Sequence, residues 1–504
     1  MIMYLSLALI TVAYVVYWIL TKHYDYWKKR NIVGPEPKFI FGNTKELALQ
    51  KKFIGTIMKD IYNQFPDEKV VGIYRMIRPC LLIRDLDIVK NIMIKDFDMF
   101  MNRDSGLSED GLGANLFSTD GNTWRILRTK FTPLFTSGKL KNMFPLISER
   151  ADRLFESLDN VNENSEQDIQ LITKQYTLSS IAACAFGLDI DIRSSDEPTL
   201  NLLHRMDKQV FEGKYGIEFF MAIPGMLKAL NSVVFPAEIT KFFYDLVKTV
   251  FTQRNGVPSN RKDFMDLILE MKQQKVIRGN KLVDDEEISV ELTDDIIAAQ
   301  AFVFYVAGFE TSSATLSFLL YELTKNPEIQ EKLINEVDEA LEKCGGNVTY
   351  DVLMDLPYLT KVIDETLRKY PIVDPLQRCA VEDYKVPGTD LTIKKGEMVF
   401  VSVSGIHYDE KYYPNPEKFD PERFSTENSR DRHSCAYIPF GTGPRNCIGM
   451  RFAKVQSRMF MVKLLSQFRV EASEKTPKNI KADPKRVVLG PDQRVILKII
   501  PRHK

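Results

Sequence analysis

The feature that most constrains this chain is a long apolar segment predicted to be one helix, Leu292–Lys325. From Asp295 it reads DIIAAQAFVFYVAGFETSSATLSFLLYELTK. Its apolar residues lie almost all round the helix, and such a helix is expected inside a protein instead of on its surface. With 504 residues and 44% hydrophobic content, the chain is long enough to bury a large core. The fold is therefore expected to have this helix running through its core.

Polar residues interrupt this helix at Ala307-Gly308-Phe309-Glu310-Thr311. Glycine lowers helix stability, and an acid beside a hydroxyl places polar groups where apolar ones pack better. One interpretation is a Thr311 hydroxyl bonded to a carbonyl one turn earlier and a solvated Glu310. The other is a local opening that lines a pocket. The occurrence of both residues together in an apolar helix favours the pocket.

Helical periodicity dominates the rest of the chain, and strand patterns are few. The sequence therefore predicts a mainly α fold with a minor β region assembled from distant segments. The other predicted helices are 85–96, 121–135, 144–158, 170–186, 237–254, 261–274, 327–344, 357–369 and 449–468, and the predicted strands lie near 70–84, 384–403 and 494–500.

Composition excludes several classes of function. The 68 basic and 68 acidic residues cancel, so no overall field favours nucleic acid as a partner. Six cysteines without a C-x-x-C pair indicate a reducing compartment. Five histidines without an H-x-x-x-H spacing make a zinc site built from histidine a poor interpretation. A protein ligand for any metal is therefore expected to be sulfur.

The N-terminus predicts a membrane anchor. Residues 1–20 carry no charge and are numerous enough to cross the hydrocarbon core as a helix. A basic cluster follows, so the positive-inside rule places the remainder on the cytoplasmic side. We expect a transmembrane signal-anchor at 1–21, a basic hinge containing proline and glycine at 22–43, and one large domain at 44–504.

Near the C-terminus, the stretch PFGTGPRNCIGMRFA places Cys447 among glycines, prolines and an arginine before an amphipathic run. Alone it is compatible with a buried structural thiol, an anion-binding loop or a metal ligand. Two helical pairs are equally ambiguous. Glu365 and Arg368 suit an ordinary surface ion pair, and Trp124 and Arg128 suit cation–π packing on one helix face.

Together these motifs resemble the cytochromes P450. The loop matches the family's F-x-x-G-x-R-x-C-x-G pattern, and A-G-x-E-T, E-x-x-R, W-x-x-x-R and P-E-R-F occur in family order. The residues around these motifs are most similar to those of the insect microsomal group associated with plant toxins and insecticides. The resemblance implies the P450 fold in a single large domain, haem b as cofactor and monooxygenase activity of the unspecific type.

The resemblance also implies roles for individual residues. Cys447 would be the axial thiolate ligand of the iron, Phe440 would shield the sulfur, and glycines would let the loop curl closely. Cations would bind the propionates. The cofactor-binding set is Cys447, Phe440, Gly441, Gly443, Arg445, Gly449, Trp124, Arg128, Arg103 and Arg378.

On the other face of the haem, Thr311 and Glu310 would deliver protons to dioxygen. Ala307 and Gly308 would leave room for O2. Glu365, Arg368 and Arg423 resemble the family's structural triad, which has a role in folding and none in catalysis.

The implied reaction inserts one oxygen atom into a lipophilic substrate. The chain has no dinucleotide-binding motif, so electrons are expected from NADPH through NADPH–cytochrome P450 reductase, with cytochrome b5 as a further candidate. The enzyme would lie in the endoplasmic reticulum membrane and face the cytoplasm. A basic cluster would dock the reductase, although a solvated surface explains it equally well. Its residues are Arg125, Lys130, Lys139, Arg451, Lys454 and Arg458.

Five segments are the expected walls of the substrate pocket, and an apolar stretch near 217–236 is expected to dip into the bilayer or simply to pack as a helix. Asp374 is expected either to bind a polar group of the substrate or to face water. Haem-thiolate isomerase or dehydratase, haem sensor, phosphate-binding enzyme and structural adaptor remain alternative classes. The walls are 105–117, 211–234, 302–311, 372–377 and 487–491.

Overall fold

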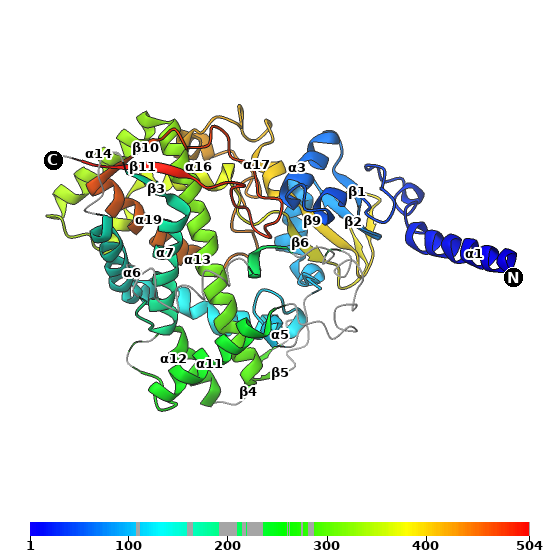
Figure 1. The fold of residues 1–504 in the computed structure, drawn as a ribbon, viewed down its shortest axis with the longest axis horizontal. Helices are drawn as coiled ribbons and strands as arrows, with labels where there is room; N and C mark the ends of the chain where they lie inside the picture. The colour runs from blue at the N-terminus through cyan, green and yellow to red at the C-terminus, as the bar shows by residue number, and fades with distance from the viewer. Residues whose placement is uncertain are drawn as a thin grey trace.

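The computed structural model of this chain confirms a mainly α fold with small sheets, arranged as one domain with an apolar N-terminal helix. Helices occupy one side of the domain, and the largest sheet lies on the side nearest that N-terminal helix (Figure 1). The structure describes residues 1–106, 111–158, 165–190, 209–213, 218, 235–259, 261, 263–273, 276–280 and 287–502.

Most predicted helices form within three residues of their expected limits. Two short π-helical turns, Asn91–Lys95 and Ala182–Phe186, extend α4 and α7. The α-helices are α1 (Ile2–Thr21), α2 (Lys45–Ala48), α3 (Ile54–Gln64), α4 (Leu86–Lys90), α5 (Gly121–Phe131), α6 (Ser137–Leu158), α7 (Ile169–Ile181), α11 (Ala237–Gln253), α12 (Phe264–Gln273), α13 (Asp294–Lys325), α14 (Pro327–Lys343), α15 (Tyr350–Met354), α16 (Pro357–Lys369), α17 (Val403–His407), α18 (Thr426–Ser429) and α19 (Met450–Gln467).

The β region consists of small sheets built from distant segments. The largest has the order β1-β2-β9-β6, from Val70–Arg75, Arg78–Ile83, Met398–Val401 and Leu376–Cys379. Only its β2–β9 pair is parallel. An antiparallel sheet joins β10 (Phe468–Ala472), β11 (Ile496–Pro501) and β3 (Glu166–Asp168), and two-stranded ribbons form from β4 (Val276–Asn280) with β5 (Glu287–Glu291) and from β7 (Tyr384–Lys385) with β8 (Thr392–Ile393).

The apolar helix α13 runs through the core, as its composition predicts (Figure 1). The Thr293 hydroxyl caps its first turn by accepting from the Ile296 N–H, and Asp294 and Asp295 suit the positive end of the helix dipole. Asn326 ends the helix, and Pro327 begins α14. Along much of its length α13 packs against α7. This long helix therefore fixes the position of residues 307–311 inside the domain.

Two expectations about secondary structure are wrong in detail. Helix α6 begins at Ser137, seven residues before the predicted start, and contains Pro145. Pro145 is exposed, so the Lys141 carbonyl that loses its helical hydrogen bond can be hydrated. The strand expected over 384–403 divides into β7, β8 and β9 because turns interrupt it, including one at Gly388 with φ +71° and one at Gly396 with φ +81°.

Helix α1 is fully outside the domain core. None of its residues is buried, and its mean hydropathy over 18 residues is 2.0. Helix α13 also has the length and composition of a membrane span, but 67% of its apolar window is buried inside the protein. Among the described helices, α1 therefore fits a membrane anchor and α13 is a core helix.

Part of the segment predicted as a hinge packs against the largest sheet. Trp27 is only 2% exposed, and its indole N–H donates to the Ile73 carbonyl at 3.0 Å. A Cβ on Gly72 would lie 2.4 Å from the Trp27 ring, so this approach requires glycine. Arg30 forms an ion pair of 2.6 Å with Glu397. Residues between α1 and the domain are thus held at defined points on the β-sheet.

Candidate active site

The loop that precedes α19 is folded tightly around Cys447. Gly441 and Gly443 adopt φ angles of +71° and +73°, which favour glycine. A Cβ on Gly443 would lie 1.8 Å from the Met93 carbonyl oxygen, so no side chain fits there. The Cys447 N–H donates to the Phe440 carbonyl at 2.8 Å and closes the loop. Sequence and geometry therefore agree that the glycines let the backbone of this loop pack closely against neighbouring atoms.

The Cys447 side chain is accessible although protein surrounds it. The residue is exposed, yet burial by the surrounding chain raises the pKa of its thiol. A hydrogen bond from the Gly449 backbone and the positive charges of Arg128 and Arg103 act in the opposite direction and lower this pKa. Both observations fit a sulfur that faces a hollow inside the domain.

One face of α13 is also uncovered in the middle of the core. Val303, Ala307 and Thr311 recur every four residues and are half-buried or exposed, whereas most neighbouring residues are buried. The Thr311 hydroxyl donates to the Ala307 carbonyl at 2.8 Å. Gly308 has a different environment, because a Cβ there would lie 2.8 Å from the Ile181 side chain of α7. Ala307 and Thr311 thus open a space, and Gly308 allows close helix packing.

The Cys447 loop and the uncovered face of α13 border the same hydrophobic core. Phe440 and Ile448 in the loop, like Val303 and Val306 in α13, are half-buried side chains packed on the same hydrophobic core. Apolar groups around a sulfur ligand control the access of solvent. A flat apolar cofactor with a soft metal centre fits this combination.

The buried Arg378 and Arg445 and the half-buried Arg103 gather close to the loop, and Asp120 is the carboxylate that contacts them among the described residues. Asp120 accepts from Arg445 Nη2 at 3.1 Å and from the Arg103 backbone N–H at 2.8 Å. Burial lowers the pKa of Arg445 to about 9 and that of Arg103 to about 10. The pKa of Arg378 lies well below its usual range for the same reason, with further lowering by the other two cations. This excess of buried positive charge calls for anions.

Unsatisfied donors in this cluster show that the residues fit a haem. Among the described atoms, Arg445 Nε and Nη1 and Arg378 Nε have no hydrogen-bond partner. Buried guanidinium groups are normally paired, and carboxylates are their usual partners. Two propionates would supply what is missing. The Arg445 guanidinium also lies 4.6 Å from the centroid of the Trp124 ring, which is 4% exposed.

Arg128 is bound to the loop itself. Its Nη1 and Nη2 donate to the Asn446 carbonyl and side-chain oxygen, both at 2.8 Å. Asn446 directly precedes Cys447 in the chain. Arg128 therefore anchors the loop and places a positive charge beside the sulfur, in addition to any contact with a propionate.

Glu310 does not lie beside the Thr311 hydroxyl in a simple pair. Its carboxylate is only 4% exposed and forms ion pairs with Arg486 and, at 3.2 Å, with Lys174 of α7. Glu310 also lines a polar cavity of about 230 Å³ between α7, α13 and the C-terminal segment, and this cavity includes Ser313 and Asp483. The acid is thus connected to a hydrophilic space on its own side of α13.

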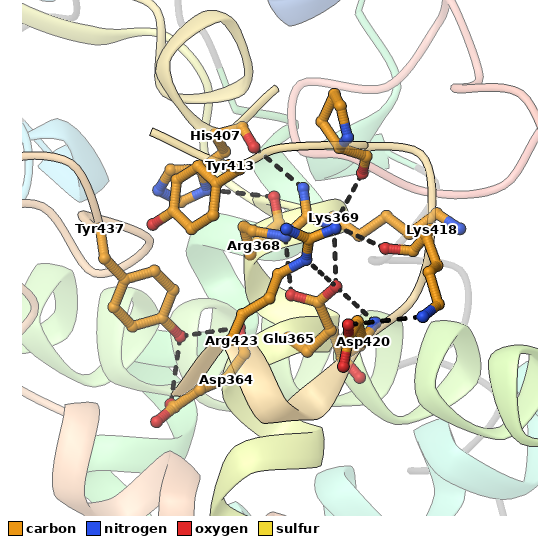
Figure 2. A network of polar contacts seen from close by, with 12 residues as sticks. Asp364, Glu365, Arg368, Lys369, His407, Tyr413, Lys418, Asp420, Arg423 and Tyr437 are labelled. Carbon is orange, nitrogen blue, oxygen red and sulfur yellow. Dashed lines mark hydrogen bonds and ion pairs between the residues drawn. The ribbon is translucent and has the colours of Figure 1, made fainter. Parts of the chain in front are cut away.

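The E-x-x-R motif forms a fully buried ion pair instead of a surface pair. Arg368 Nε and Nη2 donate to the two oxygens of Glu365 at 2.7 and 2.9 Å, and both side chains are 0% exposed (Figure 2). Arg423 Nε lies 3.5 Å from Glu365, and the Asp420 N–H donates to the same carboxylate at 2.8 Å. The three residues of the predicted triad therefore meet.

Both expectations for Asp374 are wrong. Asp374 is 4% exposed and accepts hydrogen bonds from the backbone N–H groups of Val403 and Ser404 at 2.8 and 3.1 Å. Its carboxylate thus satisfies donors at the start of α17, where free helical N–H groups need acceptors. It faces neither a substrate pocket nor water.

Several of the expected pocket walls come together. The Val487 N–H donates to the Phe211 carbonyl at 2.9 Å, and the Leu489 N–H donates to the Ile372 carbonyl at 2.8 Å. Phe211 and Phe309 pack edge to face at 6.0 Å. These contacts join four of the five predicted walls. Residues 107–110, 214–217 and 219–234 lie outside the described residues, and with them most of the predicted membrane-dipping stretch.

The predicted docking patch contains one residue that is wrongly placed. Arg458 is 4% exposed, and it donates to the Thr360 hydroxyl at 2.7 Å between α19 and α16. Its position on the buried face of α19 explains the error. Arg451 is exposed, whereas Arg125 pairs with Asp98 at 2.6 Å and Lys454 pairs with Asp364 at 3.3 Å. Lys130 and Lys139 are half-buried.

A comparison with protein-family models matches residues 33–498 to the family described as Cytochrome P450. The chain belongs to the cytochrome P450 family. It is 52% identical to cytochrome P450 6B2 of Helicoverpa armigera, over 96% of each chain. It is 50% identical to cytochrome P450 6B1 of Papilio polyxenes, over 98% of this chain and 99% of that protein, and 38% identical to cytochrome P450 6a8 of Drosophila melanogaster, over 98% of each.

Membership settles the chemistry at the family level. This P450 is a monooxygenase of the insect microsomal type, and its cofactor is haem b with a cysteine thiolate as axial ligand. Sequence reasoning missed Lys174 and Arg486, the two bases that hold Glu310. Each is a single basic residue far from any motif, so no spacing in the sequence pointed to them.

Proposed function

We propose that this P450 inserts one atom of O2 into lipophilic small molecules, among them xenobiotics such as plant toxins or insecticides. NADPH–cytochrome P450 reductase supplies the electrons, and cytochrome b5 is a second candidate donor. The observation that carries the proposal is the cluster of Arg103, Arg378 and Arg445 beside the Cys447 loop, in which Arg378 and Arg445 have unsatisfied buried donors.

Cys447 is the proposed iron ligand, and the loop prepares it for that role. The Gly449 backbone and the charges of Arg128 and Arg103 favour the thiolate form. Arg445, Arg103 and Arg378 bind the propionates, with Trp124 packed beneath Arg445. Haem bound through a thiolate supplies the activation of dioxygen. The protein side of the site therefore orients the cofactor and balances its charge.

Thr311 and Glu310 are the proposed proton donors. The Thr311 hydroxyl donates to the Ala307 carbonyl, so its lone pairs remain available to accept a proton from the uncovered side of α13. Glu310 is held by Lys174 and Arg486 at the edge of the polar cavity. We infer that protons enter through this cavity, pass to Glu310 and reach Thr311 through water or a side-chain rotation.

Apolar side chains beside the uncovered face of α13 support lipophilic substrates. Aromatic and aliphatic side chains of α11, α13 and the segment around residue 211 form a closely packed cluster there, and apolar side chains are typical of sites for lipophilic ligands. Val306 belongs both to this cluster and to the half-buried face of α13. The residues of the cluster are Val210, Phe211, Ile239, Phe243, Phe302, Tyr305, Val306 and Phe309.

We propose that α1 anchors the enzyme in the endoplasmic reticulum membrane with the catalytic domain in the cytoplasm. The support is its uncharged length of 20 residues and the basic residues that follow it, Lys22, Lys28, Lys29 and Arg30. The segment packed at Trp27 and Arg30 would then hold the domain close to the bilayer.

Reconstitution with purified reductase tests the proposed reaction. The expected result is NADPH consumption that depends on the reductase, together with one labelled oxygen atom from isotopically labelled O2 in the product of an apolar plant toxin. A product labelled from water instead, or conversion without NADPH, would contradict it. Matched polar conjugates of the same toxin serve as controls and are expected to be poor substrates.

A further inference from the structure

His407 connects the E-x-x-R helix to the chain segment that leads into the Cys447 loop. It is the last residue of α17 and is 0% exposed. Its imidazole is stacked on the Tyr437 ring, with the ring centroids 5.5 Å apart and the planes inclined by 22°. Figure 2 shows the ring between Arg368 on one side and Tyr437 on the other. No motif recognised in the sequence includes this histidine.

The hydrogen bonds of the ring determine which nitrogen carries the proton. Nε2 lies 3.1 Å from the backbone N–H of Ile438, which is a donor only, so Nε2 must accept. Nδ1 lies 3.0 Å from the Arg368 carbonyl oxygen, which is an acceptor only, so Nδ1 must donate. The partners therefore select the neutral tautomer protonated on Nδ1. A doubly protonated ring would place Nε2–H against the Ile438 N–H.

The surroundings of the ring also favour the neutral form. Burial and the charges of Arg368 and Arg432 together lower the pKa of His407 from 6.5 to about 3. Around physiological pH the ring is therefore uncharged and has one donor and one acceptor. Both are used by backbone groups of other segments.

The contact with Arg368 is reciprocal. The guanidinium Nη1 of Arg368 donates to the His407 carbonyl at 2.9 Å, while the His407 ring donates to the Arg368 carbonyl. The buried ion pair of Arg368 with Glu365 thus fixes both the backbone and the ring of His407. The buried Glu365–Arg368 pair therefore holds His407 Nε2, the acceptor of the Ile438 N–H, in a fixed position.

From Ile438, hydrogen bonds continue into the loop. The Gly441 N–H donates to the Ile438 carbonyl at 3.0 Å, and the Cys447 N–H donates to the Phe440 carbonyl at 2.8 Å. His407 therefore holds the N–H of Ile438. The carbonyl of Ile438 in turn accepts the hydrogen bond that closes the turn containing Phe440. A displacement at Ile438 would move the carbonyl that fixes the Cys447 backbone.

We propose that His407 is a positioning residue that, through its acceptor bond to the Ile438 N–H, holds the Cys447 loop in the position required for thiolate ligation. The inference rests on Cys447 being the haem ligand, as proposed above. His407 does not touch the cofactor in this account. It transmits the rigidity of the Glu365–Arg368 pair to the loop.

Three substitutions separate the donor from the acceptor. His407→Gln has an amide long enough to offer its oxygen to Ile438, whereas the shorter amide of His407→Asn reaches only the position of Nδ1 and can donate to the Arg368 carbonyl. His407→Phe keeps the ring against Tyr437 and loses both bonds. The readout is the ratio of the red-shifted to the blue-shifted Soret band of the reduced carbon monoxide complex in the full-length holoenzyme, followed against temperature.

Loss of the bond to Ile438 leaves a buried N–H unsatisfied, which corresponds to about a ten-fold change in that ratio. We expect this loss in His407→Asn and His407→Phe and a ratio within about three-fold of the unmodified enzyme in His407→Gln. If His407→Phe does not fold, the comparison of the Asn and Gln variants decides.

Gln330 provides a matched control. It is 3% exposed, and its amide likewise makes one donor and one acceptor bond to backbone, both with Val470, at 2.9 and 2.7 Å. Gln330→Leu is expected to destabilise the fold without changing the ratio of the two bands. The inference is overturned if His407→Asn resembles the unmodified enzyme, if Asn and Gln lose the band equally, or if Gln330→Leu shows the same loss.

Failure of the underlying assignment looks different. If Cys447→Ala retains the red-shifted band, then Cys447 is not the ligand and the proposed function fails, whatever the His407 variants do. If Cys447→Ala loses the band while all His407 variants keep it, the assignment of Cys447 stands and only the role of His407 is rejected.

Discussion

Glu310 in α13 is ion-paired with Arg486, 176 residues further along the chain. Arg486 belongs to the C-terminal segment that also pairs with Phe211 and Ile372, and its guanidinium lies 5.6 Å from the centroid of the Phe211 ring. The proposed proton donor is therefore attached to the segment that adjoins one of the predicted walls of the substrate pocket. Its charge and its position depend on that segment.

Replacing Glu310 tests its role as an acid. Glu310→Gln keeps the shape of the side chain and removes its ionisable proton, so we expect product formed per NADPH to fall about a hundred-fold. The carbon monoxide spectrum should stay unchanged, because the substitution lies away from the thiolate. Asp483→Asn alters another acid of the same cavity and is the control, with little expected effect. If Glu310→Gln forms as much product per NADPH as the unmodified enzyme, Glu310 is not the proton donor.

The buried triad makes a prediction about stability. Glu365→Gln leaves Arg368 charged, fully buried and without its carboxylate, and such a change costs about 3–5 kcal/mol of unfolding free energy. Glu422→Gln breaks the exposed pair with Lys361 and should cost less than about 1 kcal/mol. Denaturant unfolding of both variants is the measurement. Equal unfolding free energies of the two variants would show that the buried pair stabilises the fold no more than the exposed pair does.

The environment of His407 predicts a pH dependence of stability. Its pKa is about 3 in the folded protein and 6.5 in the unfolded chain, so unfolding takes up a proton between these values. The stability that it contributes is complete above pH 6.5 and is lost as the pH falls toward 3, by up to about 5 kcal/mol. His407→Gln should have a shallower acid limb in unfolding curves.

The contribution of Asp374 to stability changes with pH in the opposite direction, and the unfolding experiment must take it into account. Burial raises the pKa of its carboxyl from 3.8 to about 6, so the folded protein holds this proton longer than the unfolded chain does. Its contribution is complete below pH 3.8 and is lost as the pH rises through 6. An acid limb that is identical with and without His407 would contradict the histidine assignment.

The packed segment before the domain predicts unequal effects for two tryptophans. Trp27→Ala removes a side chain that is 2% exposed and should cost about 3–5 kcal/mol. Trp18→Ala alters a residue of α1 that is 55% exposed and should leave the unfolding free energy of the domain unchanged. Thermal unfolding in detergent compares them. If both behave alike, the segment around Trp27 is not part of the folded unit.

Much of the fold follows from periodicity in the sequence, because long amphipathic or apolar helices repeat their pattern many times. Helix α16 begins and ends where its pattern predicts, between Pro357 and Lys369. Where a single local signal competes with tertiary packing, sequence reasoning fails. The predicted start of α6 at residue 144 is wrong, because packing on α19 and α7 holds the helical turns on both sides of Pro145.

The candidate site divides in the same way. Residues with a characteristic spacing, such as Glu365 and Arg368, could be found from the sequence, and the structure shows that they are buried together. Partners that are single residues brought in by the fold could not be found. Lys174, Arg486 and His407 belong to this second group. Asp374 shows the converse error, since an unusual acid in a pocket segment serves only to cap a helix.

The most direct test of the whole account is the spectrum of the reduced carbon monoxide complex in the full-length enzyme and in Cys447→Ala. We expect a strongly red-shifted Soret band in the enzyme and its complete loss in Cys447→Ala. Cys344→Ala, which alters a free cysteine in the first turn after α14, should keep the band. A protein that binds no haem, or a red-shifted band that survives in Cys447→Ala, would contradict the central claim.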